Sequence, residues 1–521
     1  MKYAIDLYSG IGGWTMGMKL SGIKNLASYE WWKEANQTHN INFNTNHKEV
    51  NIRDLNVDEL NFKHKIDFVV GSPPCTQFSY ANRGGNGNLA DGLVDIYKFL
   101  EVVEFLKPKY WAMENVPRVS KILRKELEKN GSLERFNSLV KINEVVDSAD
   151  YGVPQNRKRM IAGDFPWELF QSYKSNIKIV TFGQVLKALS RKKIEDPNYG
   201  YILPRNKVTE LENEANLTIQ EERINSDSKT FHPIYNKMSF PDRLDRPSRT
   251  VTATCTRVSR ESIIVKSKTG YRRLNVRERG VIQGFPITYQ YYGRTLNAKF
   301  KMIGNAVPPI LTYYIFQSMK EVSVEKIVSP KYSKYKHVQP KYKSYDSNLG
   351  LPKRKYPAKR KFQFAVPNLR YGSGVRFELS NNPKSEGIPW SFKFFYGTSK
   401  QIKEIKLDKE IKNSLAPIVN TTKNEMFTDF IEKISKNYKS FNSSELQGKW
   451  TSTQLNNDVF NFLDDVGGCV HEILQNAEIS DSEMRLVPSI LQEKNKKIEE
   501  NSKSILVGFY FLSSLNQKLF S

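Results

Sequence analysis

A mostly parallel β-sheet with helices on both faces is the fold that the sequence predicts for residues 1–165. Three short apolar stretches, at residues 3–7, 66–70 and 110–113, have the length and composition of buried strands. Between them lie helix-like stretches such as residues 96–106, where apolar side chains recur every three or four positions. Strand, turn and helix in repeated order are typical of α/β folds, whose ligands bind at the carboxyl ends of the strands.

The remainder of the 521-residue chain divides by composition. Residues 166–240 are polar and less periodic, and residues 241–325 are compact again. Residues 326–361 form a connector, in which twelve Lys and Arg face the single acid Asp346 and tyrosines are interleaved. The connector can hold phosphates and stack on bases, or it can be a solvated linker. Residues 362–521 carry their own strand-like and helix-like patterns, which predict a separate α+β domain.

The composition favours a polyanionic partner inside the cell. The formal net charge is +25 and the isoelectric point is about 9.6, a surplus that nucleic acid most often balances. Cys75, Cys255 and Cys469 have no metal-clip spacing and make an odd number, so we expect neither a metal site nor a disulfide framework. No apolar run is long enough for a membrane helix, and the N-terminus has no signal-peptide layout.

Three groups near the predicted strand ends indicate a nucleoside cofactor. A glycine-rich turn over residues 6–13 would let backbone amides approach a ligand. Glu30 could accept from ribose hydroxyls, and Trp31 could cover an adenine face. Asp54 could accept from an adenine amino group. A structural turn or a surface position explains each of them alone, but together they have the spacing of consecutive sheet units.

Cys75 follows two prolines in the run Gly71-Ser72-Pro73-Pro74-Cys75. The prolines stiffen the chain and would hold the thiol at the rim of the sheet, where ligands bind. A buried, inert cysteine is the usual interpretation of a lone thiol, but a stiff loop at the end of a strand is a poor place for one. The glycine-rich residues 82–88 are typical of a loop that closes over a substrate.

Eight motifs, in the same order, resemble those of the DNA (cytosine-5) methyltransferase family across residues 1–320. They are Asp6 to Gly13, Glu30-Trp31, Pro73-Pro74-Cys75, Glu114-Asn115-Val116, Gln155-Asn156-Arg157-Lys158-Arg159, Arg246 to Thr252, Arg277-Glu278 with Gln283-Gly284-Phe285-Pro286, and Gly304-Asn305-Ala306-Val307-Pro308-Pro309. The resemblance implies a Rossmann-like class I methyltransferase domain over residues 1–165 and 241–325, with residues 166–240 as the target-recognition region.

The resemblance also implies a reaction, which is methyl transfer from S-adenosylmethionine to carbon-5 of cytosine in a specific sequence of double-stranded DNA. Cys75 would add to carbon-6 of a flipped base. Glu114 would activate the ring, Arg159 would hold its carbonyl oxygen, and Arg157 would support the same site. We expect these cationic neighbours to lower the pKa of Cys75. No metal is required.

The family pattern assigns binding residues as well. The expected cofactor contacts are Asp6, Tyr8, Ser9, Gly10, Ile11, Gly12, Gly13, Glu30, Trp31, Asp54, Leu55, Pro74, Asn305, Ala306 and Val307. The expected DNA contacts are Ser79, Arg83, Gln155, Arg249 and Thr250. By analogy we expect a monomer that acts on DNA in the bacterial cytoplasm, associated with the nucleoid, in restriction-modification or phage defence.

Two positions depart from the family pattern, and three alternatives stay open. Thr76 stands where glutamine is more common, and Tyr8 where phenylalanine is usual. A tRNA-methylating branch has similar residues 7–10, but its Cys-Phe-Thr signature is missing here. Amino-methyltransferases carry an aromatic residue where Cys75 stands. Residues 362–521 could be a DNA-binding or partner-binding module or a nuclease, since Glu404-Ile405-Lys406 matches part of a nuclease pattern in a helix-like stretch.

Overall fold

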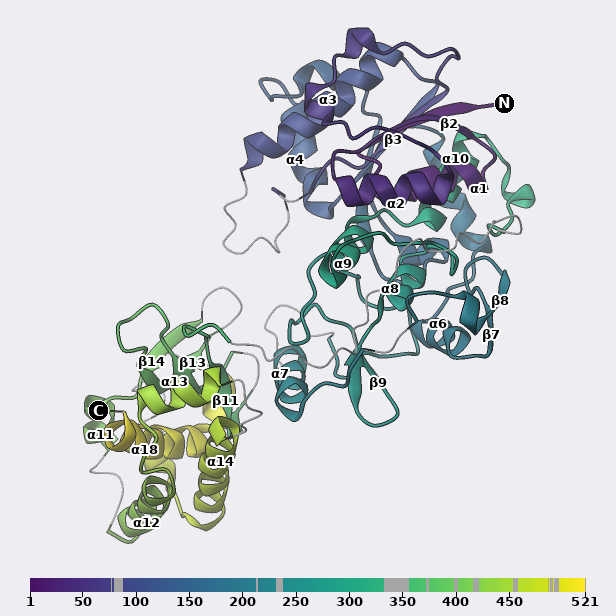
Figure 1. Ribbon diagram of the computed structural model, residues 1–521. Coiled ribbons are helices and arrows are strands. Elements are labelled where there is room, and N and C mark those ends of the chain that lie inside the picture. Colours follow the sequence, from purple (N-terminus) through teal and green to yellow (C-terminus); the bar gives the residue numbers. More distant parts are fainter. Residues whose placement is uncertain are drawn as a thin grey trace. The chain divides into compact units, whose positions relative to one another are not determined.

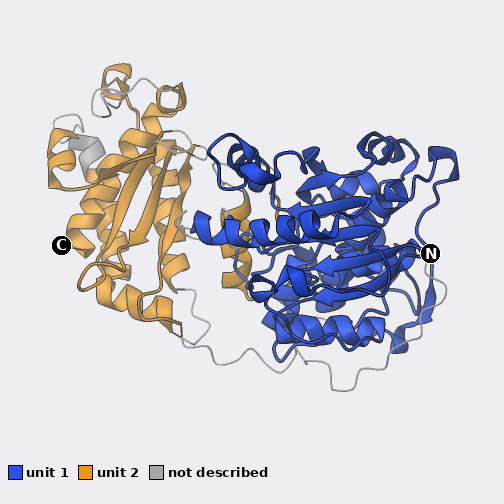
Figure 2. Ribbon diagram, turned by 90° about the horizontal axis from the view of Figure 1, so that it is seen from above, with its two compact units in different colours: residues 1–217, 241–350 blue, residues 218–240, 351–521 orange. Residues whose placement is uncertain are grey.

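Two compact units make up the computed structural model of the chain (Figures 1 and 2). Unit 1 comprises Met1–Leu217 and Pro241–Gly350, and unit 2 comprises Thr218–Phe240 and Leu351–Ser521. The structure describes residues 1–75, 77–78, 88–211, 214–230, 238–331, 356–371, 374–397, 402–415, 421–452, 458–485, 487, 491 and 496–520.

A six-stranded sheet forms the centre of unit 1. Its spatial order is β2 (Lys24–Tyr29), β1 (Tyr3–Leu7), β3 (Phe68–Gly71), β4 (Tyr110–Asn115), β6 (Lys158–Asp164) and β5 (Ile142–Asp147). The first four strands are parallel, and β6 runs antiparallel to both β4 and β5. The chain leaves β1 for β2 on one side and later enters β3 on the other. The carboxyl ends of β1 and β3 therefore form the switch point at which ligands bind in open α/β sheets.

Helices cover both faces of this sheet, which confirms the predicted α/β fold. On one face, α1 (Gly13–Leu20) and α10 (Pro309–Met319) pack with Val70 in one apolar cluster. On the other face, α3 (Leu89–Leu106) and α4 (Pro117–Leu127) pack with Val69. Neighbouring residues of β3 thus serve opposite faces, as the alternation of side chains along a strand requires.

The other helices and strands of unit 1 are short. They are α2 (Lys33–Phe43), α5 (Trp167–Ser172), α6 (Phe182–Leu189), β7 (Lys193–Glu195), β8 (Ile202–Pro204), β9 (Ile264–Lys266), β10 (Tyr271–Arg273), α8 (Val276–Ile282) and α9 (Leu296–Asn305). The elements α6, α8 and α9 share a further apolar cluster that includes Val185, Val281 and Phe300.

An antiparallel sheet packed on helices forms unit 2, in agreement with the expected α+β domain. The strand order is β11 (Gln363–Arg370), β12 (Arg376–Asn381), β13 (Trp390–Tyr396) and β14 (Lys403–Lys406). Phe377 and Phe394 of the sheet share one core with Phe509 of α18 (Ser502–Leu519) and with α14 (Asp458–Asn476). The other helices are α7 (Ile219–Thr230), α11 (Lys409–Leu415), α12 (Thr421–Asn437), α13 (Ser443–Thr451), α15 (Asp481–Met484) and α17 (Lys496–Glu500).

The residues 404–406 correct one expectation. Glu404-Ile405-Lys406 lies in strand β14 and pairs with β13, so the expected helix-like setting was wrong. The reason is that β14 is an edge strand of its sheet, and edge strands commonly carry charged residues, lysine above all. Glu404 forms an ion pair with Lys393 of the neighbouring strand, at 2.8 Å. Among the described residues, no helix is both long enough and apolar enough to cross a membrane.

The contact between α1 and α10 has no room for a side chain at Gly17. A Cβ there would lie 2.3 Å from Thr312 Oγ1, the hydroxyl that donates to the Gly13 carbonyl at 2.9 Å. We expect Gly17→Ala to destabilise unit 1 by about 1–3 kcal/mol, because crowding outweighs the helix propensity of alanine. Gly448→Ala in α13, with open space around its Cβ, is the control and should be neutral or stabilising. Denaturant unfolding checks both, and equal stability of the two variants would contradict the expectation.

Candidate functional site

The turn between β1 and α1 brings backbone atoms to a cavity at the switch point. Tyr8 has a left-handed conformation with φ of 56°, and its hydroxyl donates to Asp95. Gly12 has φ of 88°, and a Cβ there would collide with Phe43. Only glycine therefore fits at Gly12. The residues between these two points line the cavity, together with Tyr8 itself.

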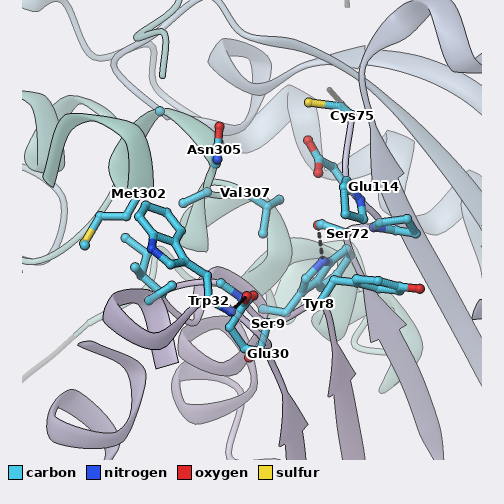
Figure 3. A pocket seen from close by; sticks show the side chains of 18 of the residues that line it. Tyr8, Ser9, Glu30, Trp32, Ser72, Cys75, Glu114, Met302, Asn305 and Val307 are labelled. Carbon is cyan, nitrogen blue, oxygen red and sulfur yellow. Dashed lines mark hydrogen bonds between the residues drawn. The ribbon is translucent and has the colours of Figure 1, made fainter. Parts of the chain in front are cut away.

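The closing segment of unit 1 lies directly against this turn. A Cβ on Gly13 would meet the carbonyl oxygen of Val307 at 2.2 Å, so the two backbones approach as closely as a glycine allows. This approach brings Asn305 and Val307 to the same cavity as Ser9, although about 300 residues separate them in sequence (Figure 3).

Glu30 follows β2 and fixes two backbone segments beside the cavity. Its carboxylate accepts from the Gly10 amide at 2.8 Å and from the Trp32 amide at 2.7 Å. Burial raises the pKa of Glu30, and the two amide donors oppose that rise. Both aromatic residues after Glu30 line the cavity. Trp31 is 62% exposed, whereas Trp32 donates to Glu34 and lies under the Lys301 ammonium, 5.0 Å from the ring centre.

The Pro-Pro-Cys run leaves β3 at the same edge and is held from two sides. Trp14 Nε1 donates to Ser72 Oγ at 3.0 Å, and Asn115 Nδ2 donates to the Pro73 carbonyl at 3.0 Å. Asn115 is buried at the end of β4. Its amide side chain therefore positions the loop that carries Cys75.

An ion pair lies beside the thiol. Arg159 Nε is 2.8 Å from Glu114 Oε1, and the two side chains are 12% and 6% exposed. The antiparallel pairing of β4 and β6, which sets Glu114 opposite Ile161, places Arg159 within reach of Glu114. Cys75, Glu114 and Arg159 all line the cavity, so the structure brings the three expected catalytic groups together.

The pKa of Cys75 corrects a second expectation. Burial raises the pKa of the thiol above its ordinary value, and Arg159 opposes this effect only in part. Glu114 adds to the rise and Arg157 opposes it. The expected lowering of the pKa was therefore wrong for the protein without ligands, because desolvation outweighs the two cations.

Arg157 serves the fold as well as the cavity. Its guanidinium is 1% exposed and donates to the carbonyl oxygens of Val251, Gly304 and Ala306, at 3.1, 2.8 and 3.1 Å. Desolvation lowers the pKa of Arg157 well below its ordinary range, and the neighbouring Arg159 adds to this effect. Arg157, just before β6, and Arg159, within it, thus have different partners, which are three backbone carbonyls for Arg157 and a carboxylate for Arg159.

The cavity measures about 290 Å³ and collects most of the expected site residues. From the expected cofactor contacts it is lined by Tyr8, Ser9, Gly10, Ile11, Glu30, Trp31, Pro74, Asn305, Ala306 and Val307. Further residues line the cavity that the sequence did not assign to the site, and they include Trp14, Trp32, Ser72, Asn115, Lys301 and Met302. Trp32 and Asn115 directly follow assigned residues, and this adjacency is the signal that could have found them.

Five expected cofactor residues do not line the cavity, namely Asp6, Gly12, Gly13, Asp54 and Leu55. Asp6 is fully buried beneath the turn and accepts from the Thr15 amide and hydroxyl. Burial raises the pKa of Asp6 to about 8, although the Thr15 hydrogen bonds oppose the rise. Asp54 is exposed and accepts from Asn51. Asp6 therefore supports the start of α1 from below, and Gly12 and Gly13 shape the turn.

The expected DNA contacts are scattered. Gln155 is fully buried, with its amide bonded to Gln283 and its oxygen to the Val251 amide, so it differs from the expectation and joins interior segments. Arg249 is tied to Asp242 and to the Ser262 carbonyl. Thr250 is half-buried, and its hydroxyl donates to the Asn156 carbonyl at 2.8 Å. Ser79 and Arg83 lie outside the described residues, as does Thr76.

Comparisons with known proteins agree with this site. The family model "C-5 cytosine-specific DNA methylase" matches residues 3–321. Type II methyltransferase M.FnuDI of Fusobacterium nucleatum is 27% identical over 347 residues, which cover 62% of this chain and 95% of that protein. Type II methyltransferase M1.HphI of Haemophilus parahaemolyticus is 29% identical over 336 residues, covering 61% and 87%.

Solved structures are similar over the same part of the chain. The structure of Entamoeba histolytica methyltransferase EhMeth has a TM-score of 0.44 and 16% identity, and it covers 62% of this chain and 98% of that one. The family model spans more than half of the chain. The protein is therefore a DNA methyltransferase and belongs to the C-5 cytosine-specific DNA methylase family.

Proposed function

We propose that the protein methylates carbon-5 of cytosine in a specific double-stranded DNA sequence, through a covalent bond between Cys75 and a flipped base. The observation that carries the proposal is the shared cavity of Cys75, Glu114 and Arg159 with the β1–α1 turn. The family membership supports DNA as the substrate. The Type II relatives support restriction-modification or phage defence as the setting. A monomer acting in the bacterial cytoplasm on nucleoid DNA fits the same proposal.

The cavity fits S-adenosylmethionine as the cofactor, which supplies an electrophilic methyl group when bound. Ser9 Oγ is buried and lines the cavity, and among the described residues it has no hydrogen-bond partner. An unsatisfied buried hydroxyl is costly, and a polar ligand would satisfy it. Glu30 would hold ribose hydroxyls, and Trp31 and Trp32 would enclose the adenine.

Cys75 and Glu114 would both activate the base, Cys75 by covalent addition and Glu114 by hydrogen bonding to the ring. The Cys75 thiolate forms a bond to carbon-6, and the electron pair of the ring double bond moves to make carbon-5 nucleophilic. Glu114 meets ring nitrogen-3 and the exocyclic amino group, and Arg159 holds the carbonyl oxygen where negative charge develops. After carbon-5 gains the methyl group and loses its proton to a base, the sulfur–carbon bond breaks and the thiolate returns.

Replacement of the nucleophile tests the proposal. Cys75→Ser should lower methyl transfer to duplex DNA by about a thousandfold or more, because a serine hydroxyl does not add to carbon-6 at neutral pH. Bisulfite sequencing reads the modified base and the target together, and tRNA is assayed in parallel. Cys255→Ser, outside the cavity, is the control and should stay active. Full activity of Cys75→Ser would favour amino-group methylation, and transfer to tRNA alone would overturn the DNA substrate.

Thiol labelling against pH tests the electrostatics of the site. Because burial raises the pKa of Cys75, its thiolate fraction should be small at pH 8 and grow about tenfold per pH unit towards the pKa. Labelling with iodoacetamide, followed by mass spectrometry of the Cys75 peptide, should therefore still accelerate between pH 8 and 9.5. The urea-unfolded protein at each pH corrects for the reagent. A rate that is already constant by pH 8 would show a lowered pKa instead.

Lysine variants of Arg157, just before β6, and of Arg159, within it, should have different effects. Arg157→Lys loses the planar group that reaches three carbonyls, so we expect the Tm of unit 1 to fall by about 5–10 °C. Arg159→Lys keeps the charge beside Glu114 but loses its fixed donor geometry. We expect a Tm close to wild type and a kcat lower by about a hundredfold. A stable Arg157→Lys protein or a fully active Arg159→Lys enzyme would contradict these roles.

A further inference from the structure

Helix α7 joins the proposed recognition region to the C-terminal part of the chain. Residues 166–240 were assigned to target recognition, but Thr218–Phe240 belong to unit 2. The chain therefore crosses from unit 1 to unit 2 after Leu217, returns at Pro241, and crosses again after Gly350. Unit 2 is a discontinuous domain, and one of its helices comes from the middle of the methyltransferase sequence.

One face of α7 docks on α14 within unit 2. Two nitrogens of Arg223 donate to the two carboxylate oxygens of Asp464, each at 2.7 Å. The same guanidinium lies 4.4 Å from the ring centre of Phe460, a distance that adds a cation–π attraction. Ile224, the next residue, packs against the apolar core of unit 2. The consecutive residues Arg223 and Ile224 thus attach α7 to unit 2 through an ion pair, a cation–π contact and an apolar contact.

A second stripe of α7 is buried although it is polar. Glu221, Asn225 and Lys229 recur every fourth position and are 7%, 0% and 0% exposed. Lys229 donates to Asn225 at 2.8 Å. A helix with so little apolar surface gains its stability from the packing around it, because isolated helices of this length are marginal. The burial of Lys229 therefore reports whether α7 is docked.

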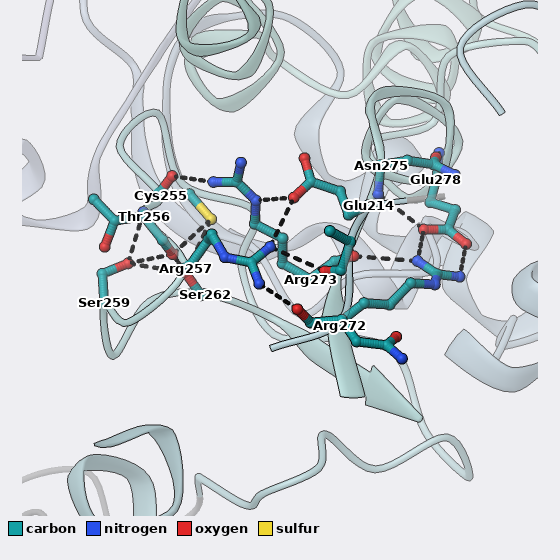
Figure 4. Close-up of polar contacts among 12 residues, drawn as sticks. Glu214, Cys255, Thr256, Arg257, Ser259, Ser262, Arg272, Arg273, Asn275 and Glu278 are labelled. Carbon is teal, nitrogen blue, oxygen red and sulfur yellow. Dashed lines mark hydrogen bonds and ion pairs between the residues drawn. The ribbon is translucent and has the colours of Figure 1, made fainter. Parts of the chain in front are cut away.

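The residues just before α7 are clamped inside unit 1 (Figure 4). Glu214 forms an ion pair with Arg273 of β10. Arg257 donates to the carbonyls of Ala215 and Asn216, and the Leu217 amide donates to the Tyr271 carbonyl at 2.7 Å. Thr218 then caps α7 through reciprocal bonds with Glu221. The clamp is defined here as residues 214–217 with their partners Arg257, Tyr271 and Arg273. Thr218 follows the clamp directly, so no flexible residues lie between the clamp and α7.

The clamp includes the loop that follows Thr250. Arg257 belongs to residues 254–262, where Cys255 Sγ is 3.0 Å from Ser262 Oγ and the Cys255 carbonyl accepts from Arg273 at 3.1 Å. Residues 246–252 were assigned to the motif after the recognition region. The 254–262 loop therefore contacts residues 215 and 216 through Arg257, and these residues lead directly into α7, the helix that packs in unit 2.

The charge of residues 362–521, the folded C-terminal part of unit 2, favours a holding role over an independent DNA-binding surface. Residues 362–521 carry 20 Lys and Arg against 19 Asp and Glu, which leaves almost no excess charge for phosphates. Proteins that bind DNA through its backbone use a surplus of basic residues. In this chain the connector over residues 326–361 has that surplus, with twelve basic residues and one acid, and its residues 351–361 are grouped with unit 2.

We propose that unit 2 is an accessory domain of target recognition, which acts by holding α7 and thereby the 214–217 segment and the 254–262 loop. The proposal rests on the proposed function, and on the assignment of residues 166–240 to target recognition that the family resemblance implies. Undocking of α7 should weaken target binding and relax sequence selection, and it should leave the chemical step at the Cys75 cavity unchanged. The coupling runs through the chain and the contacts of each unit.

A charge reversal and its rescue in the full-length protein test the proposal. Arg223→Glu and Asp464→Arg should each expose Lys229 to trypsin, measured by mass spectrometry of the cleaved peptide. Each should raise the KM for the target duplex about fivefold, with kcat at saturating DNA unchanged. The double variant Arg223→Glu/Asp464→Arg should restore both measurements. Lys496→Glu makes the same charge change in unit 2 at a residue whose side chain is 87% exposed, and it should behave as wild type.

Three results would overturn the proposal. One is exposure of Lys229 with an unchanged KM and an unchanged methylated sequence. Another is protection of Lys229 in both single variants, which would mean that this pair does not dock α7. The third is an effect of Lys496→Glu equal to that of Arg223→Glu, which would reduce the result to net charge. Failure of the proposed function is seen separately, as the absence of carbon-5 methylation by the wild-type protein.

Discussion

The guanidinium of Arg157 connects three parts of the chain on which the cavity depends. It binds carbonyl oxygens of the segment after the recognition region, at Val251, and of the closing segment, at Gly304 and Ala306. The closing segment in turn lies against Gly13 of the cofactor turn. Without this group, three buried carbonyl oxygens would have no charged donor. The walls of the cavity are thus joined by one side chain that also faces it.

Desolvation sets the electrostatics around this side chain. Burial raises the pKa of Asp6, Glu30 and Cys75 and lowers that of Arg157. The charged form of each group is therefore less stable than it would be in water. A ligand that brings charge or donors into the cavity would shift these balances. The protein without ligands holds Cys75 mostly as a thiol, and the reactive thiolate is favoured by the positive charge of Arg159.

The sequence predicted the parts of the site that follow from strand ends and motif order. Cys75, Glu114 and Arg159 were assigned together through the family resemblance. They lie after β3, at the end of β4 and at the start of β6, and the sheet brings these points to one edge. The burial of Gln155 could not be predicted, because its partners Val251 and Gln283 are about 100 residues away or more. The rise in the Cys75 pKa depends on burial, which no local pattern discloses.

That unit 2 is built from two separate segments of the chain could not be predicted from the sequence, for a similar reason. Residues 218–240 are as polar as the rest of the recognition region, and nothing local distinguishes a helix that docks on a distant partner. The strand β14 was misjudged because lysine-rich residues have no clear period. Both cases depend on neighbours that lie far away in the sequence.

Helix α7 is synthesised before α14, the helix on which it docks, and must remain without this partner for some time. Arg223 precedes its partner Asp464 by 241 residues, so at 5–20 residues per second α7 leaves the ribosome about 10 to 50 s before α14 exists. During that interval its polar stripe of Glu221, Asn225 and Lys229 can stay hydrated, whereas an apolar stripe would seek other partners. A polar helix therefore tolerates this interval, and α7 can dock only after α14 has been made.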